Sequence, residues 1–478
     1  MSFFEFDDTP TQVQHTHSSA KKPPKGGVVL NTSATDFFSG EGASFDFDVE
    51  KKKFVEHMDF LKNQSVQENT LYKKWKELTV DFNNTKDIQL AQIVEAKIWK
   101  PTDISNKELT IQEIQELSPE VVIAEPDDIT LFTDWKYLRV MCSTFEFTAN
   151  PGRLVRILIR DRNTSKYLGV CALGSDVASV GVRDQWIGWT KENKFKDGLL
   201  NSTSIGTTIV ATQPFGYNFL GGKLIASLLT TKLVRDYWKS KFGNTLVGLT
   251  TTSLYGSHSM YQRIPFWKEL GVTAGKIALK PDNGIFLNWA NYLKVHYSEA
   301  FDKATIPYVA DMVHEGEEWV CADEFVRITA TTKEELISTL ESDNYSVHNN
   351  GEVYDKKSRH KFPPTGPKQQ TMLLLFKILG IKATDYQHGF QRGVYFAPLY
   401  ENTREYLRKE IVEEQLVLST KLTNDVDAVM LWWKEKAIRR YINLYDNNRL
   451  NGDLLYYRKM TQITWDDAKQ TYLGEVGR

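Results

Sequence analysis

The stretch that decides the fold is TIVATQPFGYNFLGGKLIASLL, residues 208–229. It starts with β-branched residues, breaks at Pro214 and the glycines that follow, and continues as an apolar helical pattern. This order predicts a strand, a Gly-rich turn and a helix. Such a turn presents free backbone N–H groups at a helix N-terminus, and these groups attract anions, phosphates above all. A plain strand-to-helix corner explains the same residues equally well.

The segments on either side alternate as they do in α/β proteins. Further strands are predicted at 153–161, 168–174 and 245–254. Residues 224–243 predict one amphipathic helix with Gly243 at its C-cap, and 259–271 predict a short helix that ends at Gly271. The expected fold class is therefore α/β, a sheet with flanking helices.

Five regions are expected along the 478 residues. They are a disordered tail at 1–50, a helical segment at 51–130, the α/β core at 131–310, an inserted α/β element with a basic loop at 311–390, and a closing strand with a mainly helical part at 391–478.

Composition limits the setting of the chain. The net charge of −2 gives no global attraction to nucleic acid, so any such contact needs a local patch. Three widely spaced cysteines cannot form a disulfide framework, no apolar run is long enough to span a membrane, and the acidic N-terminus lacks the features of a secretory signal. A cytoplasmic location is expected, in the host cytoplasm if a phage encodes the chain.

The N-terminal tail combines a Ser/Lys/Pro/Gly run with two aromatic-acidic clusters. One interpretation is an ordinary solvated tail, and the other is a short peptide that docks on a protein partner, because isolated Phe side chains are unfavourable in water. The aromatic residues concerned are Phe3, Phe4, Phe6, Phe37, Phe38, Phe45 and Phe47.

Four polar or aromatic residues near the predicted sheet are candidates for chemistry. Tyr261 offers a phenol with an ordinary pKa near 10, suited to protonating a thiolate, although packing explains a lone aromatic more often. Arg183 and Asp184 are adjacent and form either a structural pair or an anion clamp and a base. His258 lies close to Tyr261 in sequence. No metal-binding motif is found.

The strand–turn–helix and the segment around Tyr261 resemble the GNAT acyltransferases. That resemblance implies a GNAT-like mixed twisted sheet with flanking helices. It also implies acyl-CoA as cofactor, held at the turn, and Tyr261 as the acid for the departing thiolate. Asn218 stands where the family has a Gly. The candidate cofactor-binding positions are Gln213, Gly216, Gly221 and Gly222, which resemble the family's loop, together with Asn218 and Lys223. The pocket is expected where the central strands splay, lined by Arg183, Asp184, Asn218, His258 and Tyr261.

The order of short motifs is similar to that of the Druantia defence protein A (DruA) family. The motifs are RDQWIGW (183–189), NST (201–203), WKELGVTAGK (267–276) and GVYFAPLYENTREYL (393–407). The resemblance implies phage–host conflict. The more distantly related Mom proteins of bacteriophage modify adenine in DNA, which implies nucleobase modification as one activity.

Two basic stretches could contact nucleic acid. The first, at 345–370, carries Lys356, Lys357, Arg359 and Lys361 after a predicted hairpin; the second, at 432–459, mixes aromatic residues with cations that include Arg439 and Arg440. A solvated loop and an ordinary amphipathic helix explain these stretches as well. Two functions therefore remain: a GNAT-like transferase acting on nucleic acid, and a non-catalytic nucleic-acid-binding or assembly protein that kept the scaffold.

Overall fold

The chain folds into two compact units, which are described separately. The first contains Asn63–Ile277 and His388–Arg478, and the second contains Ala278–Gln387 with the helix before Asn63. The computed structural model describes residues 45–146, 152–253, 260–273, 275–305, 308–322, 327–343, 345–347, 352–355, 367–389, 391–421, 425–451 and 460–473.

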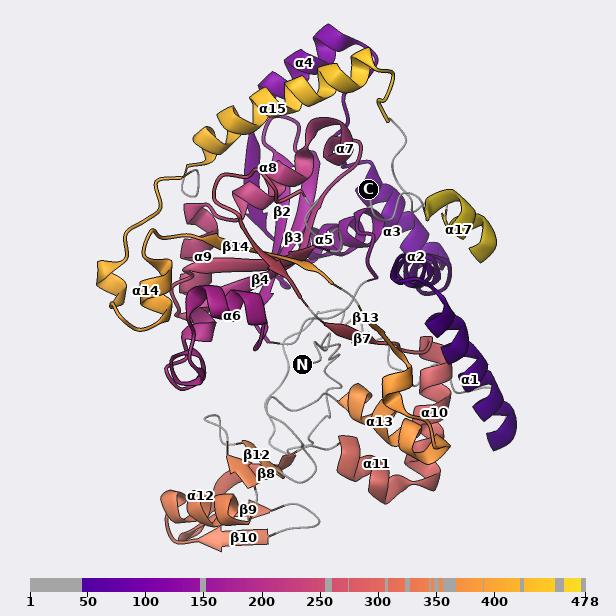
Figure 1. The fold of residues 1–478 in the computed structure, drawn as a ribbon, viewed down its shortest axis with the longest axis vertical. Coiled ribbons are helices and arrows are strands. Elements are labelled where there is room, and N and C mark those ends of the chain that lie inside the picture. The colour runs from indigo at the N-terminus through magenta and orange to yellow at the C-terminus, as the bar shows by residue number, and fades with distance from the viewer. Residues whose placement is uncertain are drawn as a thin grey trace, which may run out of the picture. The chain divides into compact units, whose positions relative to one another are not determined.

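The first unit is built on a seven-stranded sheet with the order β1-β2-β3-β4-β5-β14-β6 (Figure 1). Only β4 and β5 run parallel, and every other neighbouring pair in this sheet is antiparallel. The strands are β1 (Pro119–Ile123), β2 (Leu154–Asp161), β3 (Tyr167–Ser175), β4 (Thr203–Ala211), β5 (Gly248–Ser253), β6 (Lys268–Val272) and β14 (Gly393–Pro398).

Helices cover both faces of this sheet. The helical elements of the first unit are α2 (Val66–Lys76), η1 (Glu77–Asp81), α3 (Thr85–Glu95), α4 (Lys107–Glu116), α5 (Ile129–Cys142), α6 (Gly181–Ile187), η2 (Glu192–Lys196), η3 (Leu199–Ser202), α7 (Phe215–Phe219), α8 (Gly221–Leu228), α9 (Lys232–Phe242), α14 (Thr403–Leu407), η5 (Glu413–Gln415), α15 (Val426–Asp446) and α17 (Trp465–Tyr472).

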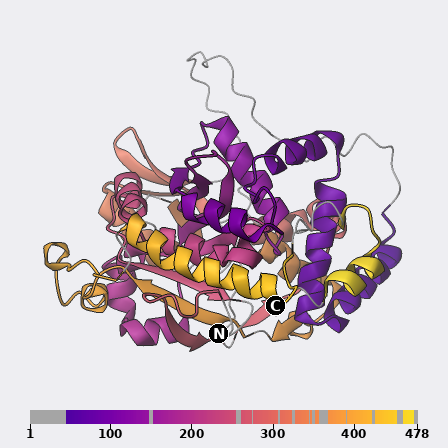
Figure 2. The same cartoon turned by 90° about the horizontal axis from the view of Figure 1, so that it is seen from above.

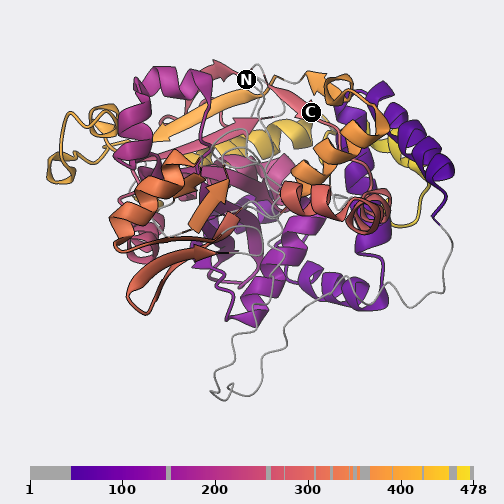
Figure 3. The same ribbon diagram turned by 90° about the horizontal axis from the view of Figure 1, so that it is seen from below.

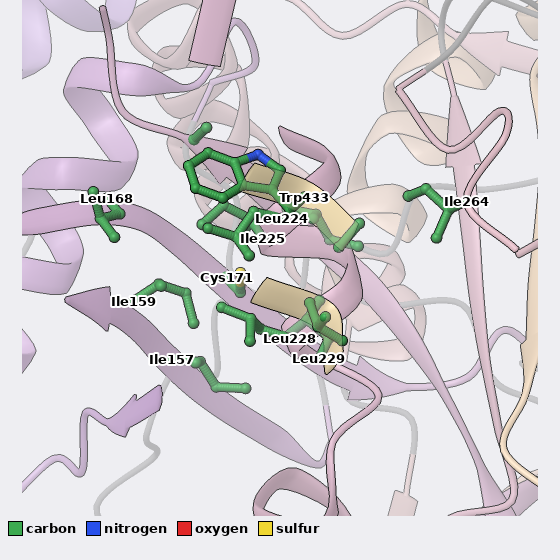
Figure 4. Close-up of a cluster of buried hydrophobic side chains, with 14 of the residues drawn as sticks. Ile157, Ile159, Leu168, Cys171, Leu224, Ile225, Leu228, Leu229, Ile264 and Trp433 are labelled. Carbon is green, nitrogen blue, oxygen red and sulfur yellow. The ribbon is translucent and has the colours of Figure 1, made fainter. Parts of the chain in front are cut away.

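One face of the sheet packs against α8, and Figure 4 shows this core. Ile157, Ile159 and Cys171 point from β2 and β3 toward Leu224 and Leu228 of α8. Side chains alternate along a strand, so the neighbouring residues point the other way. On that opposite face α5 covers β2 and β3, and α6 lies next to β14 (Figure 3).

The long helix α15 lies over α8 on the outside. It contacts α4, α7 and α8, and Figure 2 shows it crossing this side of the unit. Trp433 is fully buried there, and its indole N–H donates to the carbonyl oxygen of Leu220 at 3.2 Å. Because α7 and α8 follow β4 directly, the C-terminal part of the chain closes over the turn that the sequence singled out.

The expected class, a mixed α/β sheet with flanking helices, is confirmed, but two predicted helices are wrong. The helix expected at 224–243 is two helices, because the hydroxyls of Thr230 and Thr231 bond back to the carbonyls of Ser227 and Leu228 and interrupt the ladder. Gly243 does have the left-handed C-cap conformation.

The second wrong prediction is the short helix at 259–271. Its described part forms turns up to Trp267 and then β6, which pairs with β14. Helical spacing of the apolar residues predicted a helix, but pairing with a strand more than 120 positions away in the sequence determined the conformation.

The second unit holds a five-stranded sheet, β10-β9-β8-β12-β11, with α12 on one side. Its elements are α1 (Phe47–Asn63), α10 (Asn283–His296), α11 (Ser298–Thr305), β8 (Tyr308–Glu315), β9 (Glu318–Ala322), β10 (Arg327–Ala330), α12 (Lys333–Ser342), β11 (Tyr345–Val347), β12 (Glu352–Asp355), α13 (Pro367–Leu379) and η4 (Ala383–Asp385). The short strands β7 (Lys276–Ala278) and β13 (Gln387–Gly389) form a separate two-stranded sheet.

Part of the aromatic-acidic tail belongs to the second unit. The ring of Phe45 stacks on Tyr292 with centroids 4.2 Å apart, and Phe47 meets Trp289 edge-on at 5.5 Å. These two half-buried Phe side chains therefore contact α10 of the same chain, and docking of the tail on a protein partner stays a prediction. The other Phe residues of the two clusters lie outside the described residues.

No helix among the described residues is long and apolar enough to cross a membrane.

Candidate functional site

The strand–turn–helix predicted at 208–229 is present. β4 continues through Gln213 into α7 and then α8. The backbone N–H of Gly216 donates to the carbonyl of Thr212 at 2.7 Å, and that of Tyr217 donates to Gln213 Oε1 at 3.0 Å. No side chain caps α8, so the positive end of its dipole remains directed at the turn.

Close packing requires both glycines at the start of α8. A Cβ added to Gly221 would lie 2.4 Å from the ring of Phe215, and one added to Gly222 would lie 2.6 Å from Met260 Sδ. Their small size is therefore explained without a ligand. It also brings the backbone of 260–262 against the first turn of α8.

Asn218 joins the turn to the C-terminal part of the chain. It is fully buried, its Nδ2 donates to the carbonyl of Asn451 at 2.7 Å, and its Oδ1 accepts from the Asn451 backbone N–H at 3.1 Å. Asn218 thus has a structural role, because it anchors the segment that follows α15.

Lys223 is the charged group of the turn. Its Nζ donates to the backbone carbonyls of Met260, at 2.8 Å, and of Gln262. Burial, together with the nearby charges of Arg263 and Lys436, lowers the pKa of Lys223 to about 8. Three cations therefore gather at the N-terminal end of α8.

Tyr261 lies between the sheet and α8. Its hydroxyl is 3.4 Å from Thr251 Oγ1, and its ring meets those of Trp267 and Tyr395 at 5.1 and 5.2 Å. Only 6% of the residue is exposed, and burial raises the pKa of its phenol well above the ordinary value. A raised pKa makes the phenol a weaker acid, so packing is the role that the geometry supports best.

Arg183 and Asp184 belong to a buried charge network. The Arg183 guanidinium donates to Asp176 Oδ1 at 2.6 Å, to Asp184 Oδ1 at 2.7 Å and to the carbonyl of Val177 at 2.8 Å. The second oxygen of Asp184 accepts from Lys194 Nζ. Two carboxylates and two cations neutralise one another, and Arg183 is fully buried. Its donors hold α6 against the end of β3, so in this structure it cannot clamp a ligand.

The structure places these candidates on opposite faces of the sheet. Thr250 and Thr251 are neighbours on β5 and point to opposite sides. The hydroxyl of Thr250 donates to Asp176 Oδ2 at 2.8 Å, and that of Thr251 contacts Tyr261. The expected pocket that combined Arg183 with Tyr261 is therefore wrong: the sheet separates the two side chains.

The two arginines proposed for nucleic acid differ in their surroundings. Arg439 forms an ion pair with Glu435 one turn earlier on α15, whereas Arg440 lies over the ring of Tyr217 at 5.3 Å. The remaining predicted residues lie outside the described part of the chain: His258, Lys356, Lys357, Arg359 and Lys361.

Sequence reasoning missed the partners that decide these roles. Asp176 and Lys194 complete the network of Arg183, and Arg263 joins the cations around Lys223. Asp176 stands only seven residues before Arg183, but no motif marks it, and its second oxygen accepts from Thr250 on β5, which the sequence does not reveal. Arg263 had a weak signal, since it stands two residues after Tyr261 in a segment already considered.

Among the described residues, no group of three or more His, Cys, Asp or Glu side chains could hold a metal ion.

The fold and the site define a mixed α/β protein with a cation-lined strand–turn–helix at the end of its central parallel strand. The family model of the Druantia protein DruA matches residues 67–305, which is half of the chain. The chain belongs to the DruA family.

A curated relative is the Druantia protein DruA of Escherichia coli (strain UMEA 4076-1). It is 30% identical over 160 residues, which cover 30% of this chain and 39% of that protein. The chain thus spans about two fifths of the relative's length. No solved structure matches the chain.

Proposed function

We propose that this DruA-family chain is a GNAT-like transferase that binds a phosphate-bearing donor at the turn before α8 and acts on nucleic acid in phage–host conflict. The observation that carries the proposal is the cation-lined turn at the end of β4. The conflict setting rests on the resemblance to the Druantia family.

The strand arrangement supports a GNAT-like scaffold. β4 and β5 pair at only three positions, from Thr203–Gly248 to Ile205–Thr250, although β4 continues to Ala211. Beyond these positions the two parallel strands no longer pair, and the turn follows on the side where they have separated. A splayed central pair beside a strand–turn–helix is what the GNAT resemblance predicts.

The groups at the turn fit the pyrophosphate of an acyl-CoA. Lys223, Arg263 and Lys436 supply positive charge, and the uncapped N-terminus of α8 supplies backbone N–H groups. When bound, acyl-CoA would supply the group to be transferred. The chain's own contribution would be to bind and orient the donor through these cations.

A second function is favoured by the surroundings of Tyr261. The phenol is buried with a raised pKa, and the Arg183–Asp184 pair lies on the far face of the sheet. A protein that kept the scaffold to bind nucleic acid without catalysis would need no acid at this position. The two functions share the cationic turn and differ in whether a donor binds and reacts.

Donor binding is tested by thermal denaturation with acetyl-CoA. We expect a rise in Tm that corresponds to about 2.7 kcal/mol at one hundred times the Kd. Lys223→Gln should remove most of this rise, whereas Lys232→Gln should not, because Lys232 is an exposed residue of α9 that pairs with Asp236. If millimolar acetyl-CoA does not raise the Tm of the wild-type chain, the proposal that acyl-CoA is the donor is overturned.

Group transfer is tested by mass spectrometry of nucleosides from cells that express the chain. The transferase proposal expects an altered nucleoside that disappears with Lys223→Gln, compared at equal amounts of folded protein. Unaltered nucleosides together with retained DNA binding would contradict the transferase proposal and support the non-catalytic function.

A further inference from the structure

One flank of α15 carries an aromatic residue and two cations in line. Trp432, Lys436 and Arg440 are spaced four residues apart, so they lie one above the other along the helix. This flank borders the side buried against α7 and α8, which includes Trp433 and Ala437. The three side chains therefore follow the seam between α15 and the turn.

Residues of the turn extend this flank. The guanidinium of Arg440 lies 5.3 Å from the ring centroid of Tyr217, and Lys436 Nζ lies 5.4 Å from that of Trp432. Lys223 lies across the seam and is close enough to Lys436 for their charges to interact. We call this set the cationic patch; its members are Lys223, Arg263, Lys436 and Arg440 with the rings of Tyr217 and Trp432.

The cations of the patch have no carboxylate partner within the described part of the chain. Lys223 donates only to backbone carbonyls, and for Lys436 and Arg440 the contacts found are with aromatic rings. The Nε of Arg440 is buried without a hydrogen-bond acceptor. Other cations of the same helix are satisfied: Lys434 donates to the carbonyl of Gln115, and Arg439 pairs with Glu435.

Unneutralised like charges repel one another, and an external anion would relieve that repulsion. A polyanion suits four cations along a seam better than a single small ion does, because consecutive phosphates can meet consecutive cations. The two rings add a second kind of contact, since bases of a single strand stack on aromatic side chains and on guanidinium planes. In a duplex the bases are already stacked and offer no free face.

We propose that the cationic patch binds single-stranded nucleic acid, with its cations on successive phosphates and its rings beside unpaired bases. This deepens the proposed function, which names nucleic acid as the substrate class, but it does not require acyl-CoA.

The test is fluorescence anisotropy of the full chain with a labelled single-stranded DNA of about 16 nucleotides. Four phosphate contacts predict that log Kd changes with log salt with a slope of magnitude about 3. The double variant Lys436→Gln, Arg440→Gln should reduce that magnitude to about 1.5 and weaken binding about tenfold at 0.15 M salt.

The matched comparison is Arg439→Gln, which removes the same charge one residue away on α15 but from an existing ion pair. Its effect on the salt slope should be smaller than that of Arg440→Gln alone. Equal effects of the two single variants would show that only the net charge of the helix matters, and this would overturn the patch. Thermal denaturation of each variant verifies that it is folded.

A strand of the same length with abasic sites tests the rings without changing the protein. It should bind at least about fivefold more weakly than the normal strand, with the same salt slope, because stacking of one base contributes about 1 kcal/mol or more. Equal binding would overturn the assignment of the rings, and tighter binding to the duplex would overturn the preference for single strands.

Acetyl-CoA is titrated separately so that the two proposals can fail separately. If acetyl-CoA binds and the single strand does not, the nucleic-acid inference is overturned and the proposed donor site is still supported. Binding of the single strand that depends on Lys436 and Arg440, without binding of acetyl-CoA, supports the cationic patch and overturns the proposal that acyl-CoA is the donor.

Discussion

The charged side chains on the two sides of β5 differ in whether they are neutralised by a partner. On the side of Thr250, Arg183 and Lys194 are enclosed with Asp176 and Asp184, so every charge has a partner. On the side of Thr251, beyond Tyr261 and α8, the cations around Lys223 face one another without a carboxylate among the described residues.

This difference separates stabilising charges from charges available to a ligand. A buried network that is neutral and fully hydrogen-bonded holds elements together, and removing one member leaves an uncompensated charge. Cations that repel one another weaken the fold slightly and gain when an anion arrives. Mutation on the first side should therefore affect folding, and mutation on the second side should affect binding.

The largest effect is expected for Arg183→Met. Asp176, whose side chain is fully buried, would lose its cationic partner, at a cost of about 3–5 kcal/mol in the free energy of unfolding. Urea denaturation measures this loss. The double variant Asp176→Asn, Arg183→Met should recover part of the loss, because the buried carboxylate is then removed as well. A single variant as stable as the wild type would contradict the structural role of the network.

A paired substitution on β5 compares the two sides directly. Thr250→Val removes a donor from the charged, buried Asp176 and should cost about 1.5–3 kcal/mol in the free energy of unfolding. Thr251→Val removes a hydrogen bond to a neutral acceptor, the Gly206 carbonyl at 3.1 Å, and the 3.4 Å contact with Tyr261, and should cost less, about 1 kcal/mol. Val keeps the shape and the strand preference of Thr, so the difference reports the hydroxyl alone. Equal losses in urea denaturation would mean that the two sides are not distinguished by their hydrogen bonds.

A pH dependence of the free energy of unfolding is predicted from Lys223, and it is confined to alkaline pH. Its folded-state pKa of about 8 lies below the ordinary value of 10.5. Between these values the unfolded chain binds more protons, so the free energy of unfolding should rise with pH in this window, and not below about 8 where both states are protonated. Comparison with Lys223→Gln isolates this contribution, and identical pH profiles of the two proteins would contradict it.

Ligand binding should show the opposite trend with pH. An anion at Lys223 requires the charged form, so its affinity should fall by up to about tenfold per pH unit above about 8. Titrating acetyl-CoA or the single-stranded DNA at pH 7 and pH 9 measures this change. An affinity that falls equally in Lys223→Gln would assign the change to another group.

The local pattern of residues 208–229 was sufficient to predict the strand, the turn and the start of the helix, and the left-handed cap at Gly243 followed in the same way. These features depend on residues close in sequence, whose backbone preferences act directly on one another. The motifs around Trp186 and Trp267 also pointed correctly to the DruA family.

Distant pairing decided what local patterns could not. β14 lies between β5 and β6 although it comes from beyond residue 390, and this pairing made 268–272 a strand where the spacing predicted a helix. The pleat of β5 then placed Arg183 and Tyr261 on opposite faces, and α15 brought Lys436 and Arg440 to the turn. By itself the sequence determined the family, the mixed α/β class and the strand–turn–helix, because these depend on short-range order. Only the tertiary structure decided which charges are neutralised. The partners of Arg183 are near it in sequence, but the fold determines that their side chains meet. The cations around Lys223 come from segments far apart in the chain.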